Sequence, residues 1–178
     1  MKFLIASDVH GSAYYLNVLL KAFEREKADK LILLGDIYNH GPRNPLPKDY
    51  APMEVAKMLN AIKDKLIVIK GNCDSVVDTM ISEFDFVEDL VLVTVDKTLF
   101  LTHGHVYNKD AMPKTHYDGV IYGHFHTGFI ENINGVTVAN AGSISLPKNN
   151  TPRSYITVND GVITLKDLDG NIILEKRL

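Results

Sequence analysis

The chain has 178 residues, of which 46% are hydrophobic and 23% are charged, and its formal net charge is -3. This length and composition are typical of a globular protein with one domain and a sizeable core, and they exclude a repeat or low-complexity chain. The slightly acidic balance argues against a protein that binds the nucleic-acid backbone, unless it carries a local basic patch.

Two further features bear on where the protein works. No apolar run approaches the roughly 20 residues that a membrane helix requires, and the first residues lack the basic and then apolar pattern of a signal peptide. Cys73 is the single cysteine and has no partner for an internal disulfide, which agrees with a reducing compartment. We therefore expect a cytoplasmic protein that does not bind membranes.

In the first half of the chain, expected strands alternate with expected helices. The segments 3–6, 31–34 and 66–69 are apolar at every position, as is typical of strands buried on both faces of a parallel sheet. A long loop with four prolines precedes the second helix. The helices are predicted from apolar residues that recur on one face, namely Leu16, Leu19, Leu20 and Phe23 in the first and Val55, Leu59 and Ile62 in the second.

From about residue 90 the pattern changes to short strands. An α/β half followed by a β-rich half predicts two sheets packed face to face with helices on the outside, in a single domain over residues 1–178. A turn is expected at Asp96-Lys97, between the first two of these strands. The expected strands are 90–95, 98–102, 120–122, 129–133, 136–139, 154–158, 162–167 and 172–176.

Polar motifs follow the strands at the points where they end. A strand end can hold a ligand rigidly while a neighbouring glycine lets the backbone turn. In Asp8-x-His10 both side chains point to the same side if the chain stays extended for one more step. Each motif alone is weak, since a turn or a solvated histidine explains it, but five in this order make chance a poor explanation. They are Asp8-x-His10, Gly35-Asp36, Gly71-Asn72-x-Asp74, His103-Gly104-His105 and Gly123-His124-x-His126.

The residue types in these motifs favour a transition-metal site. Mixed Asp, Asn and His ligation without thiolates suits Mn²⁺, Fe, Zn²⁺ or Co²⁺ better than Mg²⁺ or Ca²⁺, which prefer shells of oxygen alone. Asp36 directly follows a buried strand, so we expect the other groups to converge on its carboxylate.

The series of motifs resembles the calcineurin-like metallophosphoesterase superfamily over residues 8–126. More narrowly, the segments 35–44 and 71–75 resemble the small bacterial YfcE-type phosphodiesterases, and the similarity extends to 140–143. The resemblance implies the α/β/β/α two-sheet sandwich of that superfamily. It also implies a metal-dependent phosphodiesterase with two divalent ions, Mn²⁺ first and Zn²⁺, Fe²⁺, Co²⁺ or Ni²⁺ as alternatives.

By the pattern of the superfamily, Asp36 would bridge the two metals, and a hydroxide shared between them would attack the phosphorus. The remaining ligands implied by the resemblance are Asp8, His10 and His126 for the first metal and Asn72, His103 and His124 for the second.

Cys73 departs from the superfamily, many members of which have a histidine at this position. That histidine is thought to help the leaving group, and a doubly charged monoester would gain most from a cationic donor. We therefore favour phosphodiesters as substrates. Cys73 is as readily explained as a small packing residue near the site.

His40 and Arg43 are the candidates for contact with substrate. His40 stands where related phosphatases carry a phosphate-binding arginine. Arg43 has a fork geometry suited to two phosphate oxygens, although a solvated loop arginine is the slightly favoured explanation. Among the other polar residues, we expect His105 to support a ligand or lie in a polar turn. We expect Asp74 to orient a ligand or cap a helix, and His116 to lie on the surface.

Two alternatives from other classes remain open. One is a catalytically silent scaffold resembling Vps29, which has no need of the full ligand set. The other is a nuclease of the Mre11 kind, which would need a basic groove that the sequence does not show. For the leading hypothesis the partner is a small phosphodiester rather than nucleic acid, and the resemblance suggests a homo-oligomer, either a dimer or a tetramer.

Overall fold

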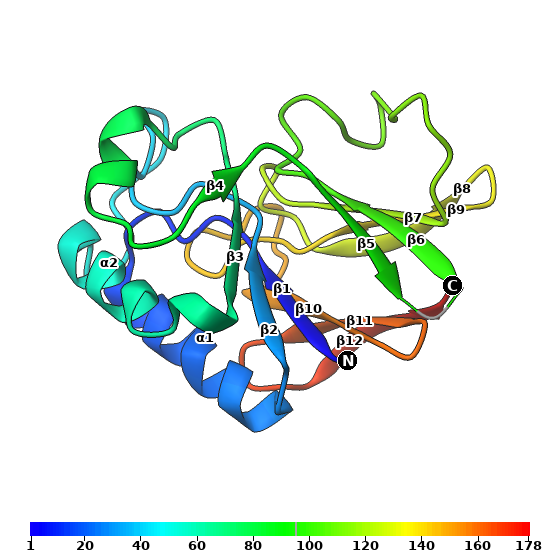
Figure 1. Ribbon diagram of the computed structural model, residues 1–178, viewed down its shortest axis with the longest axis horizontal. Coiled ribbons are helices and arrows are strands. Elements are labelled where there is room, and N and C mark those ends of the chain that lie inside the picture. The colour runs from blue at the N-terminus through cyan, green and yellow to red at the C-terminus, as the bar shows by residue number, and fades with distance from the viewer. Residues whose placement is uncertain (95) are drawn as a thin grey trace.

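Two β-sheets lie face to face, and the two α-helices lie together on the outer side of the larger sheet (Figure 1). The computed structural model describes residues 1–94 and 96–178. The larger sheet has seven strands in the order β12-β11-β10-β1-β2-β3-β4, and the smaller has five in the order β5-β6-β7-β9-β8. The predicted two-sheet α/β fold is confirmed.

The bounds of the elements are as follows. The larger sheet contains β1 (Phe3–Ala6), β2 (Lys30–Leu33), β3 (Leu66–Ile69), β4 (Phe86–Val87), β10 (Ser154–Asn159), β11 (Val162–Asp167) and β12 (Ile172–Arg177). The smaller sheet contains β5 (Leu90–Thr94), β6 (Lys97–Leu101), β7 (Gly119–Tyr122), β8 (Phe129–Ile133) and β9 (Val136–Asn140). The helices are α1 (Ala13–Glu26) and α2 (Pro52–Asn60), with short 3₁₀ turns η1 (Lys63–Lys65) and η2 (Val76–Met80).

Parallel pairing brings the carboxyl ends of the central strands to one end of the sandwich. Strands β1 to β4 run parallel to one another, and β10, β11 and β12 extend this sheet with antiparallel pairs. In the smaller sheet β6, β7 and β9 run parallel, with antiparallel β5 and β8 at the edges. The polar motifs lie in the loops that follow β1, β2, β3, β6 and β7. They therefore gather at this end of the sandwich.

Apolar clusters hold the layers together. Between the two sheets lie buried residues from both, such as Ile5 and Ile32 from the larger and Ile121 from the smaller. On its other face the larger sheet packs against the helices, which bury Leu19 of α1 and Leu59 of α2. Both faces of the central strands are thus buried, as their uniformly apolar sequences predict.

The outer face of the smaller sheet is covered differently. Tyr107, Met112 and Tyr117, from the segment between β6 and β7, pack against Phe100 and Tyr122 on this face. No helix occurs within that segment, all of which the structure describes. The helical cover expected outside the sheets is therefore present on the larger sheet, and a loop takes its place on the smaller one.

Element bounds differ from expectation by a few residues. Lys97, predicted to lie in a turn, begins β6, and Val95, the last residue of an expected strand, lies outside the described residues. Strand β4 was not predicted, because two residues are too few to show a period. In the described ranges, no helix is long and apolar enough to cross a membrane. The assignment of residues 1–178 to one domain stays a prediction.

A buried carboxylate ties α1 to the larger sheet. Glu26, the last residue of α1, accepts hydrogen bonds from Lys2 Nζ at 2.6 Å, Lys166 Nζ at 2.8 Å and the Tyr155 hydroxyl at 2.8 Å. Burial alone raises the pKa of Glu26, but the bonds from Lys166, Lys2 and Tyr155 outweigh it and lower the pKa to about 2. The folded protein therefore favours the ionised form.

Replacing this carboxylate tests the contribution of the network. Because the pKa of Glu26 is lower in the folded than in the unfolded chain, its stabilisation is present above its ordinary value of 4.5 and is lost as pH falls towards about 2. We expect Glu26→Gln to lower the free energy of unfolding at neutral pH by on the order of 1–2 kcal/mol, after allowance for solvent screening. Urea unfolding across this pH range measures the difference, which should shrink on acidification; a constant difference would contradict the assignment.

Candidate metal centre

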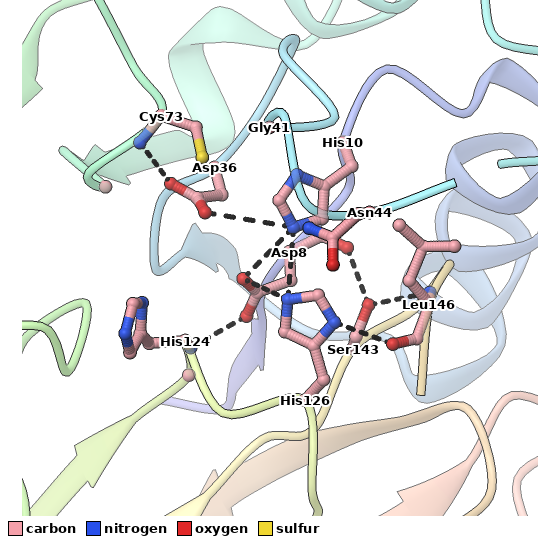
Figure 2. A network of polar contacts seen from close by, with 12 residues as sticks. Asp8, His10, Asp36, Gly41, Asn44, Cys73, His124, His126, Ser143 and Leu146 are labelled. Atoms are coloured by element: carbon pink, nitrogen blue, oxygen red, sulfur yellow. Dashed lines mark hydrogen bonds and ion pairs between the residues drawn. The ribbon is translucent and has the colours of Figure 1, made fainter. Parts of the chain in front are cut away.

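The seven predicted ligands lie together where the central strands of both sheets end. In Figure 2, Asp8, His10, Asp36 and His126 point toward one another, with His124 beside them. Asp8 and His10 follow β1, Asp36 follows β2, Asn72 follows β3, His103 follows β6, and His124 and His126 follow β7.

At five of the seven predicted ligands the backbone is not extended, contrary to the interpretation of Asp8-x-His10 from the sequence. The dihedral φ is 57° at Asp8, 49° at His10 and 55° at Asp36, and it is 62° and 60° at His124 and His126. Non-glycine residues avoid this left-handed region, where each costs about 1–3 kcal/mol. The side chains therefore converge because tight left-handed turns redirect them, and not because they alternate along a strand.

The first group of ligand atoms surrounds Asp8. His126 Nε2 lies 3.2 Å from Asp8 Oδ1, and His10 Nε2 lies 3.5 Å from the same oxygen. The two Nε2 atoms are 3.1 Å apart. All three residues are buried, so three potential ligand atoms border one enclosed space.

The second group surrounds His103. His103 Nε2 lies 3.0 Å from Asn72 Oδ1 and 3.2 Å from His124 Nδ1. Asp36 stands between the groups: its Oδ1 is 3.5 Å from His103 Nε2, and its Oδ2 is 3.8 Å from His10 Nε2. Each oxygen of the Asp36 carboxylate thus faces a different group.

The tautomers of three histidines direct the lone pair of each Nε2 atom toward the space between the two groups. Nδ1 of His10 donates to the carbonyl oxygen of Asn39 at 2.7 Å, and His103 and His126 donate in the same way to Leu34 and Leu146, both at 2.6 Å. A carbonyl oxygen can only accept, so Nδ1 carries the proton and a neutral ring leaves Nε2 with a lone pair. Such lone pairs, 3.1 Å apart for His10 and His126, repel unless a proton or a metal cation lies between them.

The carboxylate of Asp8 strengthens this argument. Its Oδ2 accepts a hydrogen bond from the backbone N–H of His124 at 2.9 Å, whereas its buried Oδ1 has no hydrogen-bond partner among the described residues. A buried carboxylate oxygen without a donor is costly, and metal coordination is one way to satisfy it. The donor set of oxygen and imidazole nitrogen therefore fits divalent transition metals.

The pKa values show how the charges interact. Burial raises the pKa of Asp8, but His10 and His126 outweigh it and hold this pKa well below its ordinary value. Burial lowers the pKa of His10, but Asp8 outweighs it, so the net shift is upward and the pocket favours a positive charge. Burial and the neighbouring His103 lower the pKa of His124 to about 4, so its ring is neutral at neutral pH.

Two glycines allow the loops to approach this closely. A Cβ atom on Gly71 would collide with the backbone nitrogen and carboxylate of Asp36, and one on Gly123 would collide with the side chain of Ser7. Any side chain at either position would separate loops that carry ligands.

Asp74 fixes the turn that presents Asp36. Its Oδ2 accepts the backbone N–H of Asp36 at 2.8 Å and of Gly71 at 2.7 Å, and its Oδ1 accepts the N–H of Ile37 at 2.8 Å. The buried carboxylate thereby joins the loop after β2 to the loop after β3. Of the two roles expected for Asp74, these bonds agree with orienting a neighbour, since they hold the turn at the predicted ligand Asp36.

Cys73 lies beside Asp36, half-buried (Figure 2). Its backbone N–H donates to Asp36 Oδ1 at 2.8 Å, and Asn72 Nδ2 donates to its sulfur at 3.4 Å. Burial, followed by the negative charge of Asp36, raises the pKa of the Cys73 thiol to about 12. The thiol is therefore protonated and uncharged, and it is no substitute for an imidazolium.

The remaining predicted residues lie in different places. His40 packs edge-on against Tyr50, with 5.3 Å between ring centroids, and does not line the cleft over the centre, whereas Arg43 is exposed and does. His105 is exposed, with its ring centroid 5.4 Å from that of His103. His116 is exposed and lines a separate hollow, which agrees with its expected surface position.

A cleft of about 800 Å³ opens over the centre. Its walls include four residues that sequence reasoning missed: Asn39, Asn44, Phe125 and Lys148. Asn39 and Asn44 lie within the segment 35–44, and Phe125 lies between two predicted ligands, so proximity in sequence was an available signal. Lys148 had none, because only the folded chain brings it to the centre.

Asp74→Asn tests how the turn at Asp36 is held. An amide offers one oxygen, so at least one of the three N–H groups that Asp74 accepts would face an NH₂ group. A buried donor without an acceptor costs about 1–3 kcal/mol, and we expect a loss of unfolding free energy of that size. Urea unfolding at mildly alkaline pH measures this loss of unfolding free energy. The control is Asp85→Asn at an exposed position; equal stability of the two variants would contradict the role of Asp74.

Sequence comparison agrees with this geometry. Residues 1–160 match the calcineurin-like phosphoesterase superfamily domain. The chain is 39% identical over 176 residues to phosphodiesterase YfcE of Escherichia coli strain K12, covering 98% of this chain and 96% of that protein. It is 29% identical over 179 residues to the probable metallophosphoesterase YsnB of Bacillus subtilis strain 168, covering 95% and 91%.

Structural comparison agrees as well. The structure of the phosphoesterase YfcE from E. coli superposes with a TM-score of 0.95 at 37% identity and covers 99% of both chains. Vps29 of Entamoeba histolytica, solved in complex with zinc, gives a TM-score of 0.65 at 20% identity over 100% of this chain and 98% of that one, and so shares the fold alone. The family match over most of the chain shows that the protein belongs to the calcineurin-like phosphoesterase superfamily.

Proposed function

We propose that the protein is a metal-dependent phosphodiesterase with a dinuclear centre. The observation that carries this proposal is the position of Asp36, whose two carboxylate oxygens face two separate groups of ligand atoms. Asp8, His10 and His126 would hold one ion, Asn72, His103 and His124 the other, and Asp36 both. The identity to phosphodiesterase YfcE supports the same reaction class.

The chemistry follows from what such a centre supplies and what the chain adds. When bound, two divalent ions polarise a phosphoryl oxygen and lower the pKa of a water between them. The chain holds the ligand atoms in fixed directions through the hydrogen bonds of the histidine Nδ1 atoms. The water would lose one proton and its oxygen would form the new bond to phosphorus. The bond to the leaving oxygen would break, and that oxygen would depart with its electron pair and take up a proton in place of the one that the water lost.

The preference for diesters rests on Cys73. A thiol is neutral or negatively charged in both of its protonation states, so Cys73 provides no cationic donor beside Asp36. A monoester dianion depends more on such a donor than a singly charged diester does. We propose phosphodiesters as the substrate class for this reason.

The choice of metal follows from the chemistry of the donor atoms. The mixture of carboxylate, amide and imidazole groups suits Mn²⁺ first, with Zn²⁺, Fe²⁺, Co²⁺ or Ni²⁺ as alternatives. A small phosphodiester remains the proposed partner, the cytoplasm the proposed location and a homo-oligomer the proposed assembly. The identity to phosphodiesterase YfcE favours an enzyme over the Vps29-like scaffold. The cluster of ligand atoms does not separate the two, because a Vps29 has been solved with zinc.

Matched chromogenic esters test the reaction. With Mn²⁺ we expect bis(p-nitrophenyl) phosphate to be hydrolysed faster than p-nitrophenyl phosphate, on the order of 100-fold in kcat/KM, because general-acid help is missing for the monoester. EDTA should abolish release of p-nitrophenol, and added Mn²⁺ should restore it. A faster monoester would overturn the diester assignment. Failure of every divalent metal to support turnover would favour the scaffold.

Substitution of Asp36 tests the bridge. Asp36→Asn removes the charge shared by both groups, so we expect kcat to fall by more than the roughly 10–100-fold typical of groups that only support a ligand. His116→Ala, at an exposed position outside the cleft, is the control and should retain full activity. Initial rates with bis(p-nitrophenyl) phosphate provide the measurement, and equal losses in the two variants would remove the bridging assignment.

A further inference from the structure

Lys148 is held at the centre by the backbone around it. Its N–H donates to the carbonyl oxygen of His126 at 2.9 Å, and its own carbonyl oxygen accepts from Thr151 N at 3.0 Å and Thr151 Oγ1 at 2.8 Å. Two residues earlier, the carbonyl oxygen of Leu146 accepts from His126 Nδ1 at 2.6 Å, and Leu146 lies beside His126 in Figure 2. The start of the Lys148 side chain is thus fixed next to a proposed ligand, while the exposed side chain lines the cleft.

A second cation lines the same cleft. Arg43 lies in a turn closed by bonds from Asn44 N to the carbonyl oxygen of Gly41 at 3.3 Å and from Asn44 Nδ2 to that of His40 at 2.9 Å. Neither Arg43 nor Lys148 takes part in an ion pair within residues 1–94 and 96–178. The only carboxylate among the lining residues is Asp36, whose charge faces the proposed metals.

This charge exceeds what a simple diester needs. A diester carries one negative charge, which two divalent ions already neutralise at the centre. Two further cations beside it match a second anionic group, and Arg and Lys side chains are the usual partners of phosphate. At about 800 Å³, the cleft is also in the range of pockets that hold whole organic ligands rather than a single phosphate group.

Phe125 adds an aromatic surface to the cleft. It is 44% exposed, and its ring meets those of His124 and Tyr122 edge-on, at centroid distances of 5.0 and 6.0 Å. Edge-on neighbours hold the ring while leaving it partly open. A nucleotide base of any kind can stack on such a ring, with a gain of about 1–3 kcal/mol.

We propose that Lys148, with Arg43, forms a subsite for a second phosphate, and that the substrates are nucleotide diesters that carry this extra phosphate while the base stacks on Phe125. The inference rests on the proposed phosphodiesterase function and specifies its substrate class. In hydrolysis, water would lose a proton and bond to the diester phosphorus, and the leaving oxygen would depart with its electron pair and take up a proton. The second phosphate would keep all its bonds and serve only for binding.

Two thymidine esters that differ by one phosphate test the subsite. Both are 5′-(p-nitrophenyl phosphate) diesters of thymidine, and one carries a 3′-phosphate in addition. With Mn²⁺ we expect the wild-type protein to prefer the 3′-phosphorylated ester at least about tenfold in kcat/KM, as one or two charge-assisted hydrogen bonds provide. Lys148→Met, which keeps the apolar stem, should reduce this preference to about twofold or less. Raised salt should reduce the wild-type preference too.

The ratio of kcat/KM between the two esters separates a loss of phosphate binding from damage to the fold, because a general loss of activity lowers kcat/KM for both esters alike. Lys21→Met, at an exposed position on α1 outside the cleft lining, is the matched control and should keep the wild-type ratio. Equal rates of the wild-type protein on both esters, or a ratio unchanged in Lys148→Met, would overturn the subsite and leave the phosphodiesterase standing. Failure to hydrolyse either ester or bis(p-nitrophenyl) phosphate with any metal would overturn both.

Phe125→Ala tests whether the base of the substrate stacks on Phe125. We expect it to lower kcat/KM for both thymidine esters about fivefold or more, relative to methyl p-nitrophenyl phosphate, which has no base. The ratio between the thymidine esters should stay unchanged, because the phosphate subsite is intact. An equal effect on all three compounds would overturn the role of Phe125 in stacking.

Discussion

Three hydrogen bonds from histidine Nδ1 atoms to backbone carbonyl oxygens are the constraint on which the centre depends. The acceptors are Leu34, Asn39 and Leu146, in segments far apart in the chain. Leu34 directly follows β2 of the larger sheet, yet it orients His103, which follows β6 of the smaller sheet. The hydrogen bonds that turn lone pairs inward therefore also join the two sheets at their polar end, so the centre and the sandwich constrain each other.

The centre concentrates unfavourable features that the rest of the fold must offset. Five proposed ligands have positive φ, at about 1–3 kcal/mol each. Buried carboxylates lie among histidine lone pairs. Against this, Asp74 accepts three backbone N–H groups, and the hydroxyls of Ser143 and Ser145 donate to the carbonyl oxygen of Asp8 at 2.8 and 2.9 Å. The apolar clusters on both faces of the larger sheet supply the remaining stability.

Reactivity and specificity lie at different depths of the cleft. The metal centre at the floor of the cleft would act on any phosphate ester that reaches it, because bound metal ions contact the phosphoryl oxygens and nothing beyond them. In the proposed enzyme, selection between esters would then fall to the thiol of Cys73 beside Asp36 and to the exposed side chains of Arg43, Phe125 and Lys148, all of which line the cleft. The side chains of Arg43 and Lys148 can differ between relatives without disturbing the buried ligands, since neither takes part in an ion pair in the described residues and only the backbone of Lys148 bonds to His126.

Local patterns determined the two sheets and the candidate residues at their strand ends, whereas the assignment of seven metal ligands came from the resemblance to the superfamily and stays a prediction. Segments apolar on both faces predicted the buried strands, and an acidic, amide or histidine residue after each predicted the centre, including Asp36. The loop over the smaller sheet, the left-handed turns, the tautomers and the position of Lys148 were decided only by the tertiary structure. They depend on contacts such as His103 to Leu34, 69 residues apart, and Lys148 to His126. Periodicity and composition report which side of an element is buried, whereas the direction of a lone pair depends on an acceptor that folding brings from elsewhere in the chain.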